Sequence, residues 1–160
     1  MERVAVFVDV QNVYYTVRQQ FNSHFDYNAF FAEVTGGKKP VAAIAYATDR
    51  SDSRQRHFQN ILRAIGFTVK LTPYITRKDG SAKGDWDVGI TVDMLEHASR
   101  VDTMVLASGD GDYAPVVTRM REQHAVEVVV YGVKQLTAAS LVRAATTFVA
   151  IEGTLVMPIP

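Results

Sequence analysis

Short apolar runs alternate along the chain with longer segments whose apolar residues recur at helical spacing. The short runs are rich in Val, Ile and Ala, and most are apolar on both faces, which is typical of parallel strands covered by helices. The run over Phe67–Ile75 partly alternates with polar residues, which indicates a strand nearer a sheet edge. Strands are therefore expected at Val4–Val10, Val41–Ala47, Phe67–Ile75, Thr103–Ala107, Val126–Tyr131 and Thr147–Ile151.

Helices are expected between these strands. Their predicted ranges are Asn12–Phe21, Tyr27–Thr35, Ser53–Ile65, Trp86–Arg100, Tyr113–Gln123 and Leu136–Ala145. Repeated β-α units with short connections predict one three-layer α/β/α Rossmann-like domain over residues 1–150, with a mostly parallel five- or six-stranded sheet. Residues 151–160 are expected to form a C-terminal tail. Its end, Thr154–Pro160, carries two prolines and no charge, which indicates a loosely packed extension or an arm for a partner.

Composition excludes several classes of chemistry. The 160 residues include no cysteine, so disulfides, thiolate zinc sites and thiol nucleophiles are ruled out. The 4 histidines are scattered without metal-ligand spacing. No apolar run approaches the roughly 20 residues that span a bilayer, and the N-terminus does not resemble a signal peptide. We therefore expect a cytoplasmic protein that does not enter a membrane.

The charges balance, but the acids are unevenly chosen. Lys and Arg number 17, as do Asp and Glu, so bulk charge would not attract nucleic acid and any such binding needs a local basic cluster. Eleven of the acids are Asp and six are Glu. Asp is a poor helix former, and its excess points to caps, turns or metal sites.

Several aspartates follow predicted strands. Asp9 ends the first strand, Asp110 and Asp112 follow the fourth, and Asp85 and Asp87 precede a helix. The carboxyl ends of parallel strands share one edge of a sheet, where ligands bind. Like charges gathered there stay ionised only beside a cation, and oxygen ligands with few histidines favour Mg²⁺ or Mn²⁺.

Each acid also has a plain structural interpretation. Asp112 could cap a helix, Asp110 could stabilise a turn, and Asp85 fits a cap or loop better than a ligand. Asn12 could cap its helix or make a polar contact in the site. Asp9 is the hardest to explain in this way, because an unpaired carboxylate is rarely buried in an apolar strand.

The helix predicted over Trp86–Arg100 offers two aspartates at different angles. At 100° per residue, Asp93 shares a polar face with Glu96, His97 and Arg100, and the opposite face is apolar. That apolar face comprises Val88, Thr91, Val92, Leu95 and Ala98. Asp87 falls at its edge in the first turn, so we prefer Asp87 as the ligand and place Asp93 in solvent, paired with His97.

Three segments together resemble a known family. They are Asp9-x-x-Asn12, then Lys83-Gly84-x-x-Asp87 with Asp93-Met94-Leu95 downstream, then Ser108-Gly109-Asp110-Gly111-Asp112-Tyr113-x-Pro115. The pattern is similar to the NYN domain, in the LabA-like branch of the PIN-like nuclease superfamily. The similarity extends over about Met1 to Ala150, and the Ser108–Pro115 stretch is its most specific part.

The resemblance implies metal-dependent hydrolysis of RNA phosphodiesters in an acidic pocket that holds one or two divalent ions. Carried over by position, it implies metal-binding roles for Asp9, Asp110 and Asp112, with Asn12 as an accompanying polar residue. It matches Asp87 to the family's Lys-Gly-x-Asp element and Asp93 to a downstream Asp. This chain has two residues between Gly84 and Asp87 where many relatives have one, so Asp85 is the alternative in register.

Basic and aromatic side chains supply candidate contacts to RNA. Arg50, Arg54, Arg77 and Lys78 could position phosphates, and Lys83 could do so or neutralise the acids. Trp86 is the first choice for stacking an unpaired base. The other candidates for stacking are Tyr14, Tyr15, Tyr74 and Tyr113.

The leading hypothesis is a metal-dependent ribonuclease that acts on single-stranded RNA. Its catalytic and metal-binding residues would be Asp9, Asp87, Asp110 and Asp112, with Ser108 in a hydrogen-bonding role because no base accompanies it. The alternative is a non-catalytic metal- or RNA-binding regulatory module, with a homodimer or protein partner. A phosphatase with Asp-x-Asp after the first strand fits poorly, since Gln11 follows Asp9. No glycine-rich phosphate-binding motif appears, so no nucleotide cofactor is expected.

Overall fold

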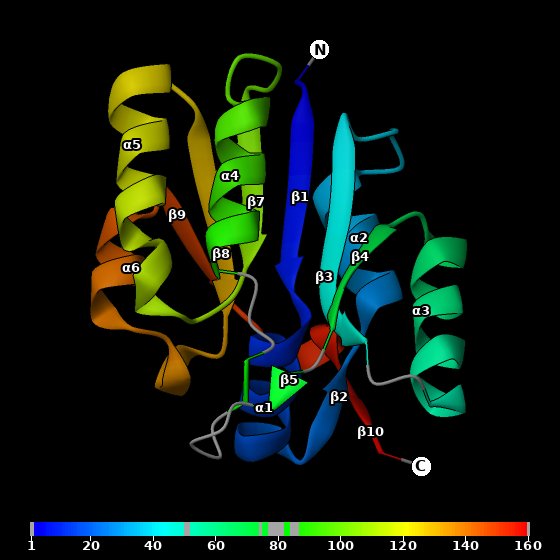
Figure 1. Cartoon of the computed structure of the whole chain (residues 1–160). Helices are drawn as coiled ribbons and strands as arrows, with labels where there is room; N and C mark the ends of the chain where they lie inside the picture. The colour runs from blue at the N-terminus through cyan, green and yellow to red at the C-terminus, as the bar shows by residue number, and fades with distance from the viewer. Residues whose placement is uncertain (1, 50–51, 74, 77–81, 84–86, 160) are drawn as a thin grey trace.

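The centre of the molecule is a six-stranded parallel sheet (Figure 1). The computed structural model describes residues 2–49, 52–73, 75–76, 82–83 and 87–159. The strands follow the order β4-β3-β1-β7-β8-β9. Their bounds are β1 Val4–Asp9, β3 Ala42–Asp49, β4 Thr68–Pro73, β7 Thr103–Ala107, β8 Glu127–Gly132 and β9 Thr147–Ala150. The predicted three-layer parallel α/β fold is confirmed.

The strand order creates a switch point between β1 and β7. From β1 the chain builds outward through β3 to β4, and then returns to place β7 on the other side of β1. Beyond β7 it builds outward again through β8 to β9. In open α/β sheets a crevice forms at the carboxyl ends of the two strands where the direction of building changes. Ligand-binding residues are therefore expected directly after β1 and β7.

Six helices cover the two faces of the sheet (Figure 1). Residues of α1 Val10–Phe21, α2 Tyr27–Thr35 and α3 Ser53–Ile65 pack in one apolar cluster, and residues of α4 Asp87–His97, α5 Ala114–His124 and α6 Ala139–Ala144 pack in the other. Alternate strand residues supply both clusters: Val6 and Val8 belong to the first, and Ala5 and Phe7 to the second. The apolar strand runs are explained by this double coverage.

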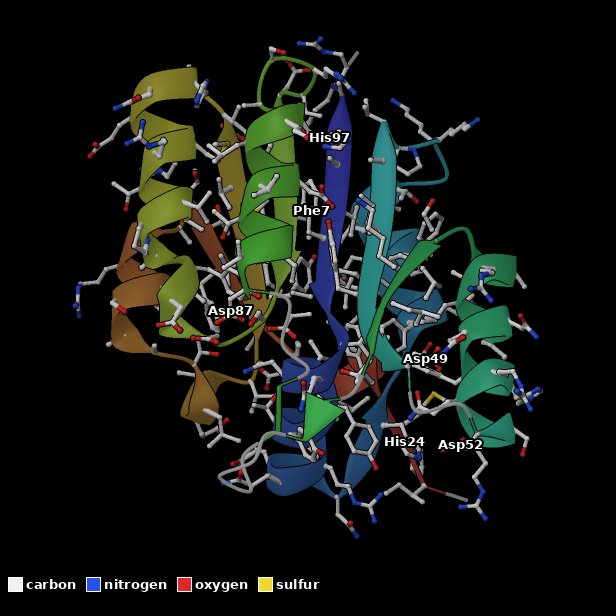
Figure 2. The ribbon with its side chains drawn as sticks, in the orientation of Figure 1. Phe7, His24, Asp49, Asp52, Asp87 and His97 are labelled. Carbon is white, nitrogen blue, oxygen red and sulfur yellow. The ribbon has the colours of Figure 1, made fainter. Side chains whose placement is uncertain are left out.

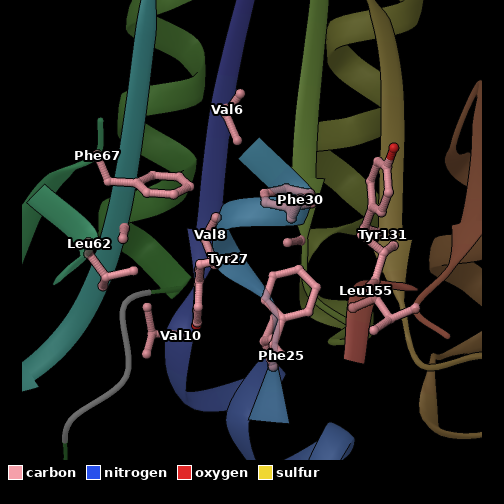
Figure 3. Close-up of a cluster of buried hydrophobic side chains, with 14 of the residues drawn as sticks. Val6, Val8, Val10, Phe25, Tyr27, Phe30, Leu62, Phe67, Tyr131 and Leu155 are labelled. Carbon is pink, nitrogen blue, oxygen red and sulfur yellow. The ribbon is translucent and has the colours of Figure 1, made fainter. Parts of the chain in front are cut away.

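Aromatic rings pack against one another in the first cluster (Figure 3). Phe30 is fully buried, and its ring lies 5.1 Å from that of Phe25 and 5.0 Å from that of Tyr131. Tyr27 packs edge-on against Phe25 and Phe67. Edge-to-face contacts of this kind add to the free energy gained by burying the rings.

Part of the Asp excess belongs to helix caps. Asp26 accepts a hydrogen bond from the backbone N–H of Ala29 at 2.9 Å and begins α2. Asp52 does the same for the N–H of Gln55 at 2.8 Å and begins α3. These acids satisfy helix N-H groups that lack an intrahelical partner.

Two predicted elements are shorter than their sequence pattern. The run over Phe67–Ile75 ends as β4 at Pro73, and β5 Ile75–Thr76 pairs antiparallel with β6 Ala82–Lys83. The helix expected at Leu136–Ala145 becomes a 3₁₀ turn, Lys134–Leu136, followed by α6. Ala138 has a non-helical backbone there, with φ −59° and ψ 134°, and its N–H donates to the carbonyl of Gly109 at 3.0 Å.

The end of the chain is packed, so the expected loose extension is wrong for residues 155–158. The short strand β10 Val156–Pro158 pairs antiparallel with β2 Ser23–Phe25, and the N–H of Asp26 donates to the carbonyl of Leu155 at 2.8 Å. Leu155 is 4% exposed within the first apolar cluster. Leu155 belongs to this cluster and Val156 packs against it, which the sequence pattern alone did not predict.

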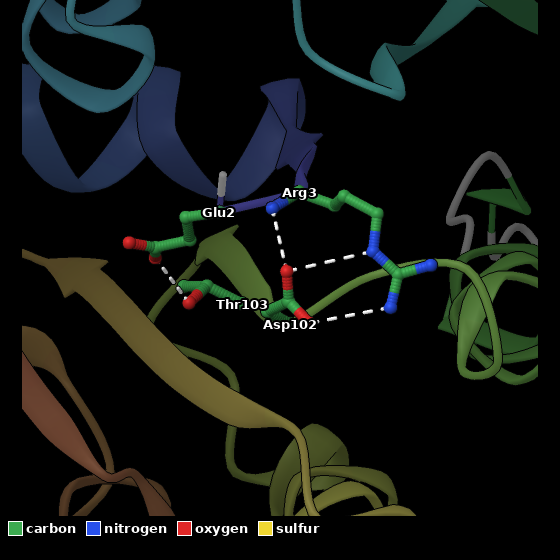
Figure 4. Close-up of polar contacts among 4 residues, drawn as sticks. All are labelled: Glu2, Arg3, Asp102 and Thr103. Carbon is green, nitrogen blue, oxygen red and sulfur yellow. Dashed lines mark hydrogen bonds and ion pairs between the residues drawn. The ribbon is translucent and has the colours of Figure 1, made fainter.

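The opposite end of the molecule is fixed by polar contacts (Figure 4). The backbone N–H of Arg3 donates to Asp102 Oδ2 at 2.7 Å, and its guanidinium donates to Asp102 Oδ1 at 3.2 Å. These hydrogen bonds hold the pKa of Asp102 below its usual value. Thr103 donates to the Glu2 carboxylate beside them. The start of β1 is thus joined to the start of β7, which aligns the two strands that flank the switch point.

Replacing Leu155 by Ala tests the packing of the C-terminal segment. We expect the free energy of unfolding to fall by about 2–3 kcal/mol, because a buried leucine is truncated and a cavity remains. Met157→Ala is the matched control in the same segment, since Met157 is 44% exposed and its loss should change stability by less than about 1 kcal/mol. Equal effects of the two substitutions, measured by urea denaturation, would contradict this packing.

Candidate metal centre

Three aspartates meet at the switch point. Asp9, Asp87 and Asp110 each offer a carboxylate oxygen, and these oxygens all lie within 4.8 Å of one another. Asp9 is the last residue of β1, Asp87 the first of α4, and Asp110 follows the end of β7. Figure 2 labels Asp87 at the end of α4 that faces α1. The expectation that separate segments deliver carboxylates to one edge is met for these three residues.

Asp9 lies deepest of the three. It is 8% exposed, and its Oδ2 accepts hydrogen bonds from Ser108 Oγ and Tyr113 OH, each at 3.2 Å. Its Oδ1 also caps α1 through the N–H of Asn12 at 3.4 Å. Burial raises the pKa of Asp9, and the charge of Asp110 adds to that rise, while the three hydrogen bonds oppose it. An added cation would favour the ionised form.

A second set of contacts fixes the loop after β7. Asn12 Oδ1 accepts from the N–H of Gly109 at 2.8 Å, and Ser108 Oγ accepts from the N–H of Asp110 at 3.1 Å. A Cβ at Gly109 would lie 3.0 Å from the carbonyl oxygen of Leu136, so glycine allows the loop to pack tightly there. Asn12 and Ser108 therefore position the loop that carries Asp110.

Tyr113 joins two of the carboxylates. Its side chain is fully buried, and its hydroxyl lies 3.2 Å from Asp87 Oδ1 as well as from Asp9 Oδ2. Burial and the two nearby acids raise the pKa of Tyr113, so the phenol keeps its proton. The interpretation of Tyr113 as a base-stacking ring is wrong, because the ring belongs to the second apolar cluster.

Asp112 does not join the three carboxylates in the part of the chain that the structure describes. It is exposed in the 3₁₀ turn Gly111–Tyr113, and its N–H donates to Asp110 Oδ1 at 2.9 Å. Its backbone thus orients Asp110, while its own side chain stays outside the group. The interpretation as a metal ligand, which the resemblance implied, has no support in this geometry.

Asp93 lies in a buried polar cluster rather than in solvent. It is 8% exposed, and its Oδ2 accepts from Tyr46 OH and from Lys70 Nζ, each at 2.7 Å. His97 contacts the backbone carbonyl of Asp93, through Nδ1 at 2.8 Å, and not its carboxylate. The predicted pairing of Asp93 with His97 on a solvated face is therefore wrong.

The error came from the rotation assigned to α4. Ile90, Asp93 and Met94 face the core, whereas Val88, Val92 and Leu95 are exposed by 78%, 47% and 41%. Hydrophobic periodicity misled because α4 has apolar residues around most of its circumference. Tyr46 on β3 pairs in register with Asp9 on β1 and with Lys70 on β4. A single sequence does not reveal these neighbours.

The expected RNA contacts are only partly within the described residues. Arg54 is exposed in the first turn of α3. Lys83 has its backbone in β6, and its side chain lies outside the description. The other predicted residues outside the described part of the chain are Arg50, Tyr74, Arg77, Lys78, Asp85 and Trp86.

Comparison with known proteins agrees with the geometry. The family model of the NYN domain matches residues 3–152. The chain belongs to the NYN family. Its resemblance to the LabA-like branch is supported by the protein "Low amplitude and bright protein LabA" of Synechococcus elongatus, which is 29% identical over 132 residues, 74% of this chain and 68% of that protein. NYN domains have a nuclease-like fold.

Solved structures extend this picture. The crystal structure of a protein of unknown function from Vibrio parahaemolyticus is 51% identical, covers 98% of this chain and 96% of that one, and superposes with a TM-score of 0.92. Ribokinase from Giardia lamblia superposes with a TM-score of 0.51 at 12% identity, over 78% of this chain and 45% of that one. The second likeness shows the fold alone. No helix among the described residues is long and apolar enough to cross a membrane.

Replacing Asp93 by Asn tests the buried cluster. We expect the free energy of unfolding to fall by about 1–2 kcal/mol at neutral pH, because the charged hydrogen bond with Lys70 is lost. Burial opposes ionisation of Asp93, but the Lys70 and Tyr46 hydrogen bonds outweigh it and lower its pKa. The stabilisation is therefore present above the unfolded pKa of about 3.9 and is lost as pH falls through the lower folded value.

Urea denaturation of both proteins between pH 3 and pH 7 measures this difference. The gap between the two unfolding free energies should be constant above about pH 5 and close at lower pH. Glu122→Gln on α5 is the control, because Glu122 is exposed and should leave stability almost unchanged. A gap of the same size at every pH would contradict the assigned role of the Asp93 charge.

Proposed function

We propose that this protein is a metal-dependent ribonuclease whose centre is formed by Asp9, Asp87 and Asp110. The observation that supports it best is the approach of three carboxylate oxygens within 4.8 Å at the switch point. Like charges at this distance repel one another, and a divalent cation among them would relieve that repulsion. The family membership supports RNA as the polymer, since NYN domains generally bind RNA.

The residues present fit a hard divalent cation. All three groups offer carboxylate oxygens, the ligands that Mg²⁺ and Mn²⁺ prefer, and the oxygens come from three separate elements that can surround one ion. When bound, such an ion would stabilise the negative charge that develops on phosphate oxygens and would acidify a bound water.

The other residues of the centre hold this constellation in place. Ser108 and Tyr113 fix the orientation of the Asp9 carboxylate, and Tyr113 also contacts Asp87. Asn12 links α1 to the loop of Asp110 through Gly109. Rigid support of this kind is what a site needs if its acids are to keep one geometry when substrate arrives. Tyr113 holds its proton on Oη between the two acids, so it is a positioning residue.

Thermal denaturation with and without Mn²⁺ tests the metal centre apart from any activity. At a Mn²⁺ concentration of about 100 times its dissociation constant, binding stabilises the fold by about 2.7 kcal/mol, which raises the Tm by about 5–10 °C. Asp110→Asn should lose most of this rise, because it removes one of the three charged ligands. Asp112→Asn should keep it, since the Asp112 side chain lies outside the group. The same rise in the wild type and in Asp110→Asn would place the metal elsewhere.

Cleavage of labelled single-stranded RNA tests the reaction itself. We expect purified protein to cleave the RNA with Mg²⁺ or Mn²⁺ and to stop when EDTA is added. Asp110→Asn and Asp87→Asn should each reduce the rate at least about 100-fold, because they remove charge that holds the cation. Loss of cleavage in these variants, purified identically, excludes a contaminating nuclease, and Glu122→Gln should keep the wild-type rate. Metal-induced stabilisation without cleavage of single-stranded or duplex RNA would instead identify a non-catalytic binding module.

A further inference from the structure

Two exposed tyrosines and a half-buried histidine lie on the elements that follow Asp9. Tyr14 and Tyr15 project from α1, and His24 projects from β2 directly after it. The rings of Tyr14 and Tyr15 meet edge-to-face at 5.3 Å, and those of Tyr14 and His24 are nearly parallel at 6.3 Å. We call these three residues the α1 aromatic cluster.

The exposure of this cluster is unusual within the molecule. Tyr14 and Tyr15 are 43% and 51% exposed, and in the described part of the chain every other Phe and Tyr ring is buried or half-buried. Exposed aromatic side chains gathered in one place often mark a binding surface. Because these two rings add nothing to either apolar core cluster, packing inside the chain does not explain them.

Tyr15 connects the cluster to the metal centre along α1, whereas Tyr14 lies about 160° around the helix from Asn12. Asn12, one turn earlier, contacts the loop of Asp110, and Tyr15 lies three residues further along the helix. Residues three apart lie on neighbouring positions of a helix surface, about 4.5 Å apart along its axis. Figure 1 shows α1 at the end of the molecule toward which β1 and β3 point, and Figure 2 shows His24 at the same end.

A cation accompanies the rings. Arg18 lies one turn beyond Tyr14, and its guanidinium is 3.5 Å from the Tyr14 hydroxyl. Arg18 is exposed, so it can contact a phosphate. Aromatic faces beside a positive charge match the two parts of a single-stranded nucleic acid, its bases and its backbone. Paired bases in a duplex do not offer their faces to a protein surface in this way.

We propose that the α1 aromatic cluster is a base-stacking site for unpaired nucleotides of RNA, on the same helix whose first turn contacts the loop of Asp110. This inference deepens the proposed function and rests on it for the identity of the polymer. Tyr14 and Tyr15 supply ring faces, His24 supports the Tyr14 ring, and Arg18 contacts the backbone. The strand would therefore pass around α1 from Tyr14 over Tyr15 toward Asn12 and the loop that carries Asp110.

Fluorescence anisotropy of a labelled uridine oligonucleotide tests the site by binding alone. EDTA is present throughout, so no cleavage is needed for the measurement. The double variant Tyr14→Ala/Tyr15→Ala should raise the Kd for the single strand by between about fivefold and about 150-fold, since one or more stacked bases are lost. Tyr14→Phe/Tyr15→Phe should stay within about twofold of the wild type, because the rings remain.

Two controls make the result specific. Val41→Ala removes a side chain of similar exposure, 45%, at the opposite end of the sheet and should not change the Kd. Circular dichroism should show that the double alanine variant folds, because both tyrosines lie on the surface. Binding of a duplex of matched length should change by less than about twofold between wild type and variant.

The outcomes separate this inference from the proposed function. If the wild type binds single-stranded RNA and the double alanine variant binds it equally well, the stacking site is overturned while the ribonuclease proposal stands. If the wild type binds no single-stranded RNA, or the variant loses duplex binding to the same extent, the stacking site is also overturned. If stacking is found but metal-dependent cleavage is absent, the inference stands and the nuclease proposal fails.

Discussion

The structure is organised around mutual repulsion among three carboxylates. Asp9, Asp87 and Asp110 converge within 4.8 Å, and Asp9 is almost fully buried. The parallel pairing of β1 with β7 brings Asp9 and the Asp110 loop to the same edge, and the Asn12–Gly109 hydrogen bond holds them there. The hydrogen bonds of Ser108, Tyr113 and Asn12 at the end of β1 hold these acids together. Burial raises the pKa of Asp9, and the nearby charge of Asp110 adds to that rise.

Asp93, the second acid of α4, forms an ion pair with Lys70 of the same chain. Asp93 lies six residues along α4 from Asp87, and Lys70 and Tyr46 donate hydrogen bonds to its carboxylate. The two acids of α4 have different neighbours: Lys70 lies beside Asp93, whose pKa is lowered, and Asp87 lies close to Asp9 and Asp110. The buried cluster fixes α4 against β3 and β4, and this anchoring sets where the first turn delivers Asp87.

The sequence predicted the sheet and its acidic edge because strands apolar on both faces and aspartates at their ends are local signals. It predicted Asp9, Asp87 and Asp110 as neighbours, but it did not separate Asp112, whose backbone rather than side chain serves the loop. It did not predict the contact between Lys70 and Asp93. That contact depends on the strand order β4-β3-β1, which cannot be inferred from the local pattern of any single segment. The pairing of the C-terminal segment was not predicted either, because its partner β2 is a three-residue strand without a recognisable pattern.

Anomalous diffraction from a crystal of this protein soaked in Mn²⁺ tests the central claim most directly. The three carboxylates should then share an anomalous peak at about 2.2 Å from an oxygen of each of Asp9, Asp87 and Asp110, and the peak should vanish in Asp110→Asn. An anomalous peak at another position would show that these acids do not form the metal site. So would the absence of a peak among them at a Mn²⁺ concentration that raises the Tm.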